Sequence, residues 1–253
     1  MSREQSQLVL EIRYQPNAKV LDHRGQWAES VATQMSLPHW LIVDNRLDVF
    51  DEEQTTRCFV GFRNVGYVTA NPPTNNFFAD QCIKFIRFVM ALEGFQSPLL
   101  VGRIGVRSRA LKPFDGTMEE LVGRYKTRYY GVKPEAERAL NGELVDIGGA
   151  LNLKDKHGNF NTHGGPMPLE QAETFFPNGK DIPQVGLYFD IDYWVRPAKL
   201  MTVDEITKTI RQFSNESITK STQVADLITG ELPHVEEAWI AGPEAQRPAR
   251  PNA

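Results

Sequence analysis

The segment from Val185 to Arg196 (VGLYFDIDYWVR) most constrains the fold, because alternate residues along it have opposite chemistry. In an extended strand, successive side chains point to opposite faces. One face carries apolar and aromatic residues: Val185, Leu187, Phe189, Ile191 and Tyr193. The other face places two carboxylates between two aromatic rings and ends in arginine: Tyr188, Asp190, Asp192, Trp194 and Arg196. This pattern predicts a half-buried strand with one face on a core and the other toward polar surroundings.

The rest of the chain predicts strands in runs, with helices between the runs. Strands are expected over 8–14, 41–50 (as a strand or as a hairpin around Asp44-Asn45), 57–62, 66–70, 99–111, 143–153 and 160–162. Helices are expected over 22–35 and 77–93, from the capping box at Thr117 to Gly131, after Pro168, and from the capping box at Thr202 toward Ile228 with a break near Asn215. Runs of strands favour an α+β fold with a mainly antiparallel sheet and helices packed on it.

Composition and length fit one folded unit. The chain has 253 residues, of which 41% are hydrophobic and 24% charged, values typical of globular domains. We expect a single α+β domain over 1–241, possibly of two similar halves (1–131 and 132–241), since in each a long strand is followed by a capping-box helix. Residues 242–253 (GPEAQRPARPNA) are Pro-rich and poor in apolar side chains, so they predict a mobile tail unless a partner holds it.

Three segments carry a resemblance to a known family: LVLEIRYQP near the N-terminus, VGRIGVRSRALKPF in the middle, and FDIDYW followed by a long C-terminal helix. With these the chain resembles an uncharacterised, sporadically distributed bacterial protein family. The resemblance implies a soluble bacterial α+β protein. It implies no activity, cofactor or catalytic residue.

Asp190 and Asp192 are the candidate metal ligands, because two carboxylates on one strand face can converge on a divalent cation. Further ligands would have to come from elsewhere, from Asp146, Glu11, His157 or His163. The alternative, which we favour, is that the two acids form cross-strand ion pairs with arginines on neighbouring strands.

Arg103, Arg107 and Arg109 share one face of the expected strand 99–111, with Gly105 between them. A row of guanidinium groups can bind a phosphate or an acidic peptide through paired hydrogen bonds. Arg124, Lys126 and Arg128 on the next helix would extend this candidate anion site. The alternative is a solvated basic face, or one balanced by the acidic strand, and the formal net charge of −4 favours it.

Aromatic residues outside the expected core are candidates for partner contacts, Trp194 and Trp239 above all. Trp40 and Tyr129-Tyr130 add to their number. Trp239 lies near the C-terminus, where chains usually fray, so an apolar anchor there predicts docking of this end on the domain itself or on another subunit.

The remaining motifs exclude several enzyme classes. His163-Gly164-Gly165 is similar to an esterase oxyanion loop, but no Gly-x-Ser-x-Gly nucleophile motif accompanies it. Phosphate-loop and dinucleotide-binding motifs are also missing, and neither the two cysteines nor the five histidines show zinc-ligand spacing. We therefore predict no cofactor.

The leading hypothesis is a non-catalytic binding or assembly protein, cytoplasmic, acting through protein–protein contacts with a partner or as a homo-oligomer. A membrane segment is not expected, and the net charge makes nucleic acid an unfavoured partner. The alternatives are a metal-dependent enzyme acting on phosphate esters through Asp190 and Asp192, or an anion- or nucleotide-sensing module that uses the three arginines.

Overall fold

The computed structural model describes residues 2–95, 97–131, 138–139 and 144–230. Its strands are β1 (Gln5–Tyr14), β2 (His39–Val43), β3 (Arg46–Phe50), β4 (Thr56–Gly61), β5 (Asn64–Ala70), β6 (Leu99–Pro113), β7 (Gly149–Lys154), β8 (Asn159–Pro168), β9 (Val185–Val195) and β10 (Lys199–Met201). Its helices are α1 (Lys19–Met35), α2 (Phe77–Met90), α3 (Met118–Tyr125), the π-helical turn η1 (Lys126–Tyr130), α5 (Leu169–Phe175) and α6 (Val203–Thr229).

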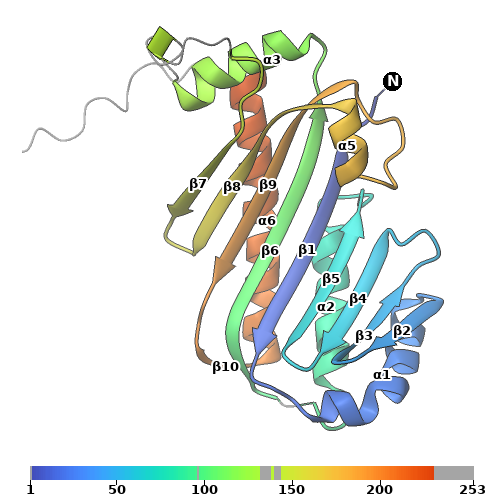
Figure 1. Cartoon of the computed structure of the whole chain (residues 1–253). Coiled ribbons are helices and arrows are strands. Elements are labelled where there is room, and N and C mark those ends of the chain that lie inside the picture. Colours follow the sequence, from blue (N-terminus) through green and yellow to red (C-terminus); the bar gives the residue numbers. More distant parts are fainter. Residues whose placement is uncertain (1, 96, 132–137, 140–143, 231–253) are drawn as a thin grey trace, which may run out of the picture.

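The strands form one antiparallel sheet, which confirms the predicted α+β class. The sheet has ten strands in the order β2-β3-β4-β5-β1-β6-β9-β8-β7, and β10 pairs with one end of β6 (Figure 1). Every pairing is antiparallel, including the central pairing of β1 with β6.

The same chain path occurs on both sides of the central pair. On one side, β1 is followed by α1, then by a meander from β2 to β5 that returns beside β1, and then by α2. On the other side, β6 is followed by α3, then by a meander from β7 to β9 that returns beside β6, and then by α6. In this path, the change from one half to the other falls between α2 and β6. The sequence had suggested a boundary at residue 131, which follows α3 and η1.

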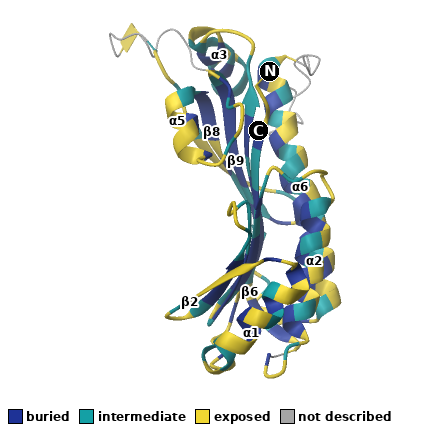
Figure 2. Ribbon diagram, turned by 90° about the vertical axis from the view of Figure 1, so that its right-hand side faces the viewer, coloured by how far each residue is buried: buried dark blue, intermediate teal, exposed yellow. Residues whose placement is uncertain are grey.

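The two faces of the sheet differ because apolar residues alternate with polar ones along much of the central strands. Leu8, Leu10 and Ile12 of β1 are buried on the side where α1, α2 and α6 lie. Figure 2 shows this side as convex, with the helices stacked along it. Of the described helices, only α5 lies on the concave side, where it covers one end through Ala172 and Phe176. An antiparallel sheet covered on one face leaves the other open for polar side chains.

Helix α6 runs behind β6 and β9 and joins the two halves of the core. Its first turns pack with the larger cluster through Ile210 and Phe213, and its last turn packs with a second cluster through Ile228. Between them lie the buried Ser214 and Ser217, whose hydroxyls donate to the carbonyls of Ile210 and Ser214. Small side chains there let the helix cross the sheet closely.

Several expected boundaries are wrong. Helix α6 continues through Asn215 without a break, because one asparagine in a helix costs under about 1 kcal/mol and the buried stripe continues on both sides. Helix α2 ends at Met90 rather than at residue 93. In place of the strand expected over 143–153, the described residues become extended only from Gly149. The two capping boxes at Thr117 and Thr202 are confirmed.

Across the described residues, no helix combines the length and the apolarity needed to cross a bilayer.

We predict that Phe213→Ala lowers the free energy of unfolding by about 3–5 kcal/mol, because removing a buried aromatic ring leaves a cavity. Phe213 is 2% exposed and packs edge-on to Tyr193, with 4.8 Å between ring centroids. Leu227→Ala on the same helix, at a side chain 38% exposed, is the control and should cost less than about 1 kcal/mol. Urea unfolding followed by circular dichroism measures both; equal losses would contradict this account of the core.

Candidate functional site

The central strands bring together the charged side chains that the sequence singled out. Arg103, Arg107 and Arg109 lie on one face of β6, and Asp190 and Asp192 lie on the same face of β9. The register sets Arg107 opposite Asp192 and Arg109 opposite Asp190. This is the open, concave face of the sheet.

Asp190 is held between two arginines. Arg107 donates from Nε to Oδ1 at 2.6 Å and from Nη2 to Oδ2, and Nε of Arg109 lies 3.4 Å from Oδ2. The Asp190 side chain is 6% exposed, whereas that of Arg107 is 43% exposed. A carboxylate this buried requires cationic partners. The hydrogen bonds with Asp190 in turn raise the pKa of the Arg107 guanidinium.

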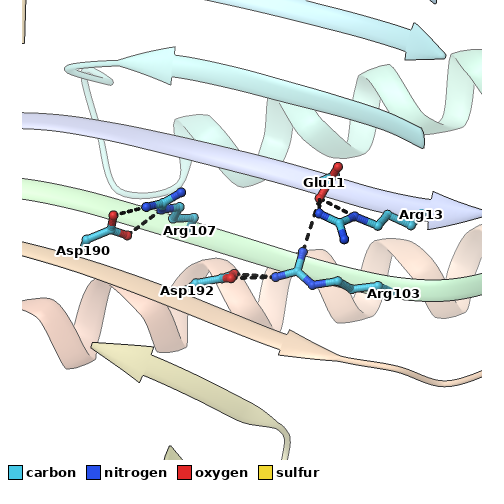
Figure 3. Close-up of polar contacts among 6 residues, drawn as sticks. All are labelled: Glu11, Arg13, Arg103, Arg107, Asp190 and Asp192. Carbon is cyan, nitrogen blue, oxygen red and sulfur yellow. Dashed lines mark hydrogen bonds and ion pairs between the residues drawn. The ribbon is translucent and has the colours of Figure 1, made fainter. Parts of the chain in front are cut away.

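A second cluster extends from β9 across β6 to β1. Arg103 donates from Nη2 to both oxygens of Asp192, at 2.8 and 2.7 Å, and its Nη1 lies 3.5 Å from Oε2 of Glu11 (Figure 3). Arg13 donates from Nε to the same Glu11 oxygen at 2.8 Å. The predicted pairing of the acids with arginines is thus confirmed. Arg107–Asp190 and Arg103–Asp192 pair along diagonals of the sheet, whereas Arg109 lies directly opposite Asp190.

A third cluster lies near the other end of the concave face, on β3 and β4. Arg46 and Arg57 both donate from Nε to Asp48, at 2.9 Å each. Asp48 is 2% exposed, whereas the two arginines are 34% and 41% exposed. This cluster was not predicted from the sequence. The alternation Arg46-Leu47-Asp48 was its signal, but the partner Arg57 comes from a different strand.

The three clusters share one layered arrangement. Each has a carboxylate with two arginines in contact: Asp48, Glu11 and Asp190. In the two most buried clusters, those of Asp48 and Asp190, the acid lies beneath the guanidinium groups. On the described strands, this face carries six arginines against four carboxylates: Arg13, Arg46, Arg57, Arg103, Arg107 and Arg109 against Glu11, Asp48, Asp190 and Asp192. The acids therefore fix guanidinium groups of which all but that of Arg103 belong to side chains at least 30% exposed, with positive charge in excess.

A hollow of about 370 Å³ adjoins this face at the end covered by α5. Its lining includes Gln5 and Gln7 of β1, Thr55 of the loop before β4, and Phe176 after α5. Arg109 donates from Nη1 to Oε1 of Gln7 at 2.9 Å, which connects the arginine row to this hollow. No sequence pattern predicted this hollow.

The remaining candidates are distributed differently. Trp194 lies on the concave face, where its ring centroid is 5.7 Å from the guanidinium carbon of Arg103 and 4.9 Å from that of Arg196. Trp239 and the tail 242–253 lie outside the described residues. Arg124 and Arg128 do not extend the arginine row as expected; they donate to the last carbonyls of α6, those of Thr229 and Ile228. Arginines there complement the negative end of the helix dipole.

The two candidate metal ligands have their oxygens engaged by guanidinium groups. His163, one of the possible further ligands, does lie opposite Asp190 in the register of β8 and β9. Over the residues that the structure describes, however, no three His, Cys, Asp or Glu side chains are grouped so that they could hold a metal ion. The arrangement suits holding an anion better than holding a cation.

Comparisons of this chain with models of known protein families and with curated proteins find no match. The resemblance described above stays a prediction.

We predict that Glu11 contributes pH-dependent stability. Burial raises the pKa of its carboxyl, but hydrogen bonds from Arg13 and Asn64 and the nearby charges of Arg13 and Arg103 outweigh burial and bring the pKa below the ordinary value of 4.5. A pKa lower in the folded than in the unfolded state stabilises the fold above the unfolded value, and this stability is lost as the pH falls through the folded value.

The measurement is urea unfolding of wild type and Glu11→Gln at pH 7, 5 and 3. The variant should be less stable at pH 7, and the difference should shrink between pH 5 and 3. A difference that stays constant over this range would contradict the ion-pair account.

Proposed function

We propose that the protein is a non-catalytic binding protein that holds an acidic segment of a partner protein on its concave face. The observation that carries this proposal is the layered charge arrangement: buried carboxylates hold guanidinium groups outward on a sheet face that, among the described helices, only α5 covers, at one end. Guanidinium groups bind carboxylates through two parallel hydrogen bonds.

Preorganisation supports a binding role. An arginine that is mobile in the free protein loses side-chain entropy when it binds a ligand, about 0.5–1.5 kcal/mol per side chain. Arg107 and Arg57, whose side chains are 43% and 41% exposed, are already fixed by Asp190 and Asp48. A partner carboxylate would meet donors that need no further ordering.

Charge and aromatic content favour a protein over nucleic acid as the partner. A duplex-binding surface is normally strongly basic, whereas this chain has a net charge of −4 and its arginines are partly neutralised. Single strands are usually bound by exposed aromatic rings. Phe59 and Tyr188 on this face are buried, and the half-buried ring of Trp194 lies against the guanidinium groups of Arg103 and Arg196.

Two alternative functions, a phosphoester-acting enzyme and a module that senses a small anion, can be tested against this proposal. A phosphoester-acting enzyme would need Asp190 and Asp192 for a metal ion, and both are engaged by arginines. A module that senses a small anion would use the same arginines without a partner protein, so phosphate and nucleotide serve as competing ligands in the test.

We predict that a fluorescent peptide of alternating Glu and Gly binds the protein, and that the Kd rises with salt because the contacts are ionic. Arg13→Gln and Arg57→Gln should each weaken binding about two- to fivefold, corresponding to about 0.5–1 kcal/mol. These side chains are 59% and 41% exposed, and the acid beside each keeps a second arginine.

Arg211→Gln is the matched control, since Arg211 is 50% exposed and ion-paired, but with Asp80 of α2 on the helical side. Fluorescence anisotropy at two salt concentrations measures all variants. Equal effects of the three substitutions would overturn the site. If phosphate, or an oligonucleotide of equal charge, binds more tightly than the peptide, that ligand and not an acidic protein segment is the one the site holds.

A further inference from the structure

Strand β2 ends the sheet on one side and exposes apolar side chains on both of its faces. Its sequence is HWLIV, and Trp40, Leu41 and Ile42 are 45%, 53% and 37% exposed. No described strand pairs with its outer edge (Figure 1). Edge strands are usually protected from pairing by lysine, proline or a bulge. None of these occurs in His39–Val43, which follows β3 in a regular register.

The hydrogen bonds of β3 show which backbone groups of β2 point outward. Asp51 N donates to Thr56 O, and Phe62 N donates to Asn45 O, so the odd-numbered residues of β3 and its extensions bond toward β4. The even-numbered residues of β3 therefore bond toward β2, and their register partners there are His39, Leu41 and Val43. The N–H and C=O groups of Trp40 and Ile42 are left to point away from the sheet.

We propose that two copies of this chain associate by antiparallel pairing of their β2 strands about a two-fold axis at Leu41. In this register, Trp40 of each copy lies opposite Ile42 of the other, and these pairs exchange the outward N–H···O=C bonds. The two Leu41 side chains meet each other on the concave face. Trp40 and Ile42 meet on the opposite face, beside the buried Val49 and Leu47 of β3.

A second copy fits this edge because the strand is complementary to itself. Its outward bonding groups are related by the proposed two-fold axis, and none of its residues is Asp, Glu, Lys or Arg. The opposite edge of the sheet, β7, carries Lys154, and a lysine on an edge strand disfavours pairing. Pairing of β2 with β7 would be head-to-tail and would produce open chains of molecules rather than a closed dimer.

The area available sets the strength of the association. Trp40, Leu41 and Ile42 together leave on the order of 300 Å² exposed in each copy, given roughly 150–250 Å² for a large side chain. Two copies would bury less than the roughly 1,000 Å² of a stable interface. The dimer is therefore concentration-dependent and weak.

Cysteine cross-linking tests the register. At the proposed axis the two residues at position 41 form a non-hydrogen-bonded pair with Cα atoms about 4.5 Å apart, within disulfide range. Leu41→Cys should give a covalent dimer under mild oxidation, in a yield that rises with protein concentration. Leu200→Cys, at a side chain 59% exposed on β10, is the matched control and should give little. The native Cys58 and Cys82 are fully buried and should not react.

Sedimentation of the full chain separates this contact from the alternatives. Wild type and Leu200→Lys should show a dimer that dissociates on dilution, whereas Leu41→Lys should stay monomeric. A monomeric wild type at every concentration overturns the proposal. So does equal cross-linking of the two cysteine variants, a ladder of larger species, or a dimer that Trp239→Ala abolishes and Leu41→Lys does not. Circular dichroism checks that the exposed substitutions leave the fold intact.

Discussion

The concave face depends on the neutralisation of nearly buried carboxylates by arginines from neighbouring strands. Asp190 and Asp48 lie beneath guanidinium groups that come from β6, β3 and β4. A buried charge without a partner would cost several kcal/mol, so these arginines cannot be lost without penalty. The same ion pairs that satisfy the acids also fix the direction of the arginines. Structural stability and the capacity to bind an anion therefore rest on the same contacts.

The charged face can stay open because the other face supplies the core. Most buried apolar residues of β1, β6 and β9 point toward the helices on the convex side, and α6 spans both halves of the sheet. Leu111 and Tyr188 are exceptions that pack under α5 on the concave side. Helix α6 is in turn held at its C-terminal end by Arg124 and Arg128, and along its length by Lys220, whose Nζ lies 3.1 Å from Asp155 Oδ2 in the β7–β8 turn. Because the helices on the convex side bury most of the apolar residues of the sheet, its concave face does not need a second layer to form the core.

Local patterns in the sequence predicted most elements, because their causes are local. The alternation around Asp190 specifies which side of β9 carries the apolar residues, and the two capping boxes specify where α3 and α6 begin. The half-buried strand that it predicted is buried on both faces from Gly186 to Ile191, because α5 and Phe176 cover that end of the concave side. The pairing of Asp190 and Asp192 with arginines was also predictable, since opposite charges on neighbouring strand faces commonly pair. The partner of each acid was not, because it depends on register and on diagonal reach between strands. The Asp48 cluster was missed for the same reason: Arg57 belongs to another strand. The break expected at Asn215 was wrong because the low helix propensity of one asparagine is a small effect. Packing of the buried stripe along the whole of α6 outweighs it.

The edge contact and the concave face are coupled through the geometry of antiparallel pairing. A two-fold axis within one sheet is perpendicular to it, so both copies would turn their concave faces to the same side. Leu41 lies opposite Asp48 in the register of β2 and β3, and the Asp48 cluster is the one closest to the proposed axis. Two such clusters would then flank the junction, with the arginine rows of β6 continuing beyond each. An acidic segment long enough to cross the junction would contact both copies and gain from effective concentration, although each cluster alone binds weakly. Weak self-association and weak anion binding would then reinforce each other. The dimer places two arginine clusters within reach of one acidic segment, and a segment bound to both copies holds the two β2 strands close together.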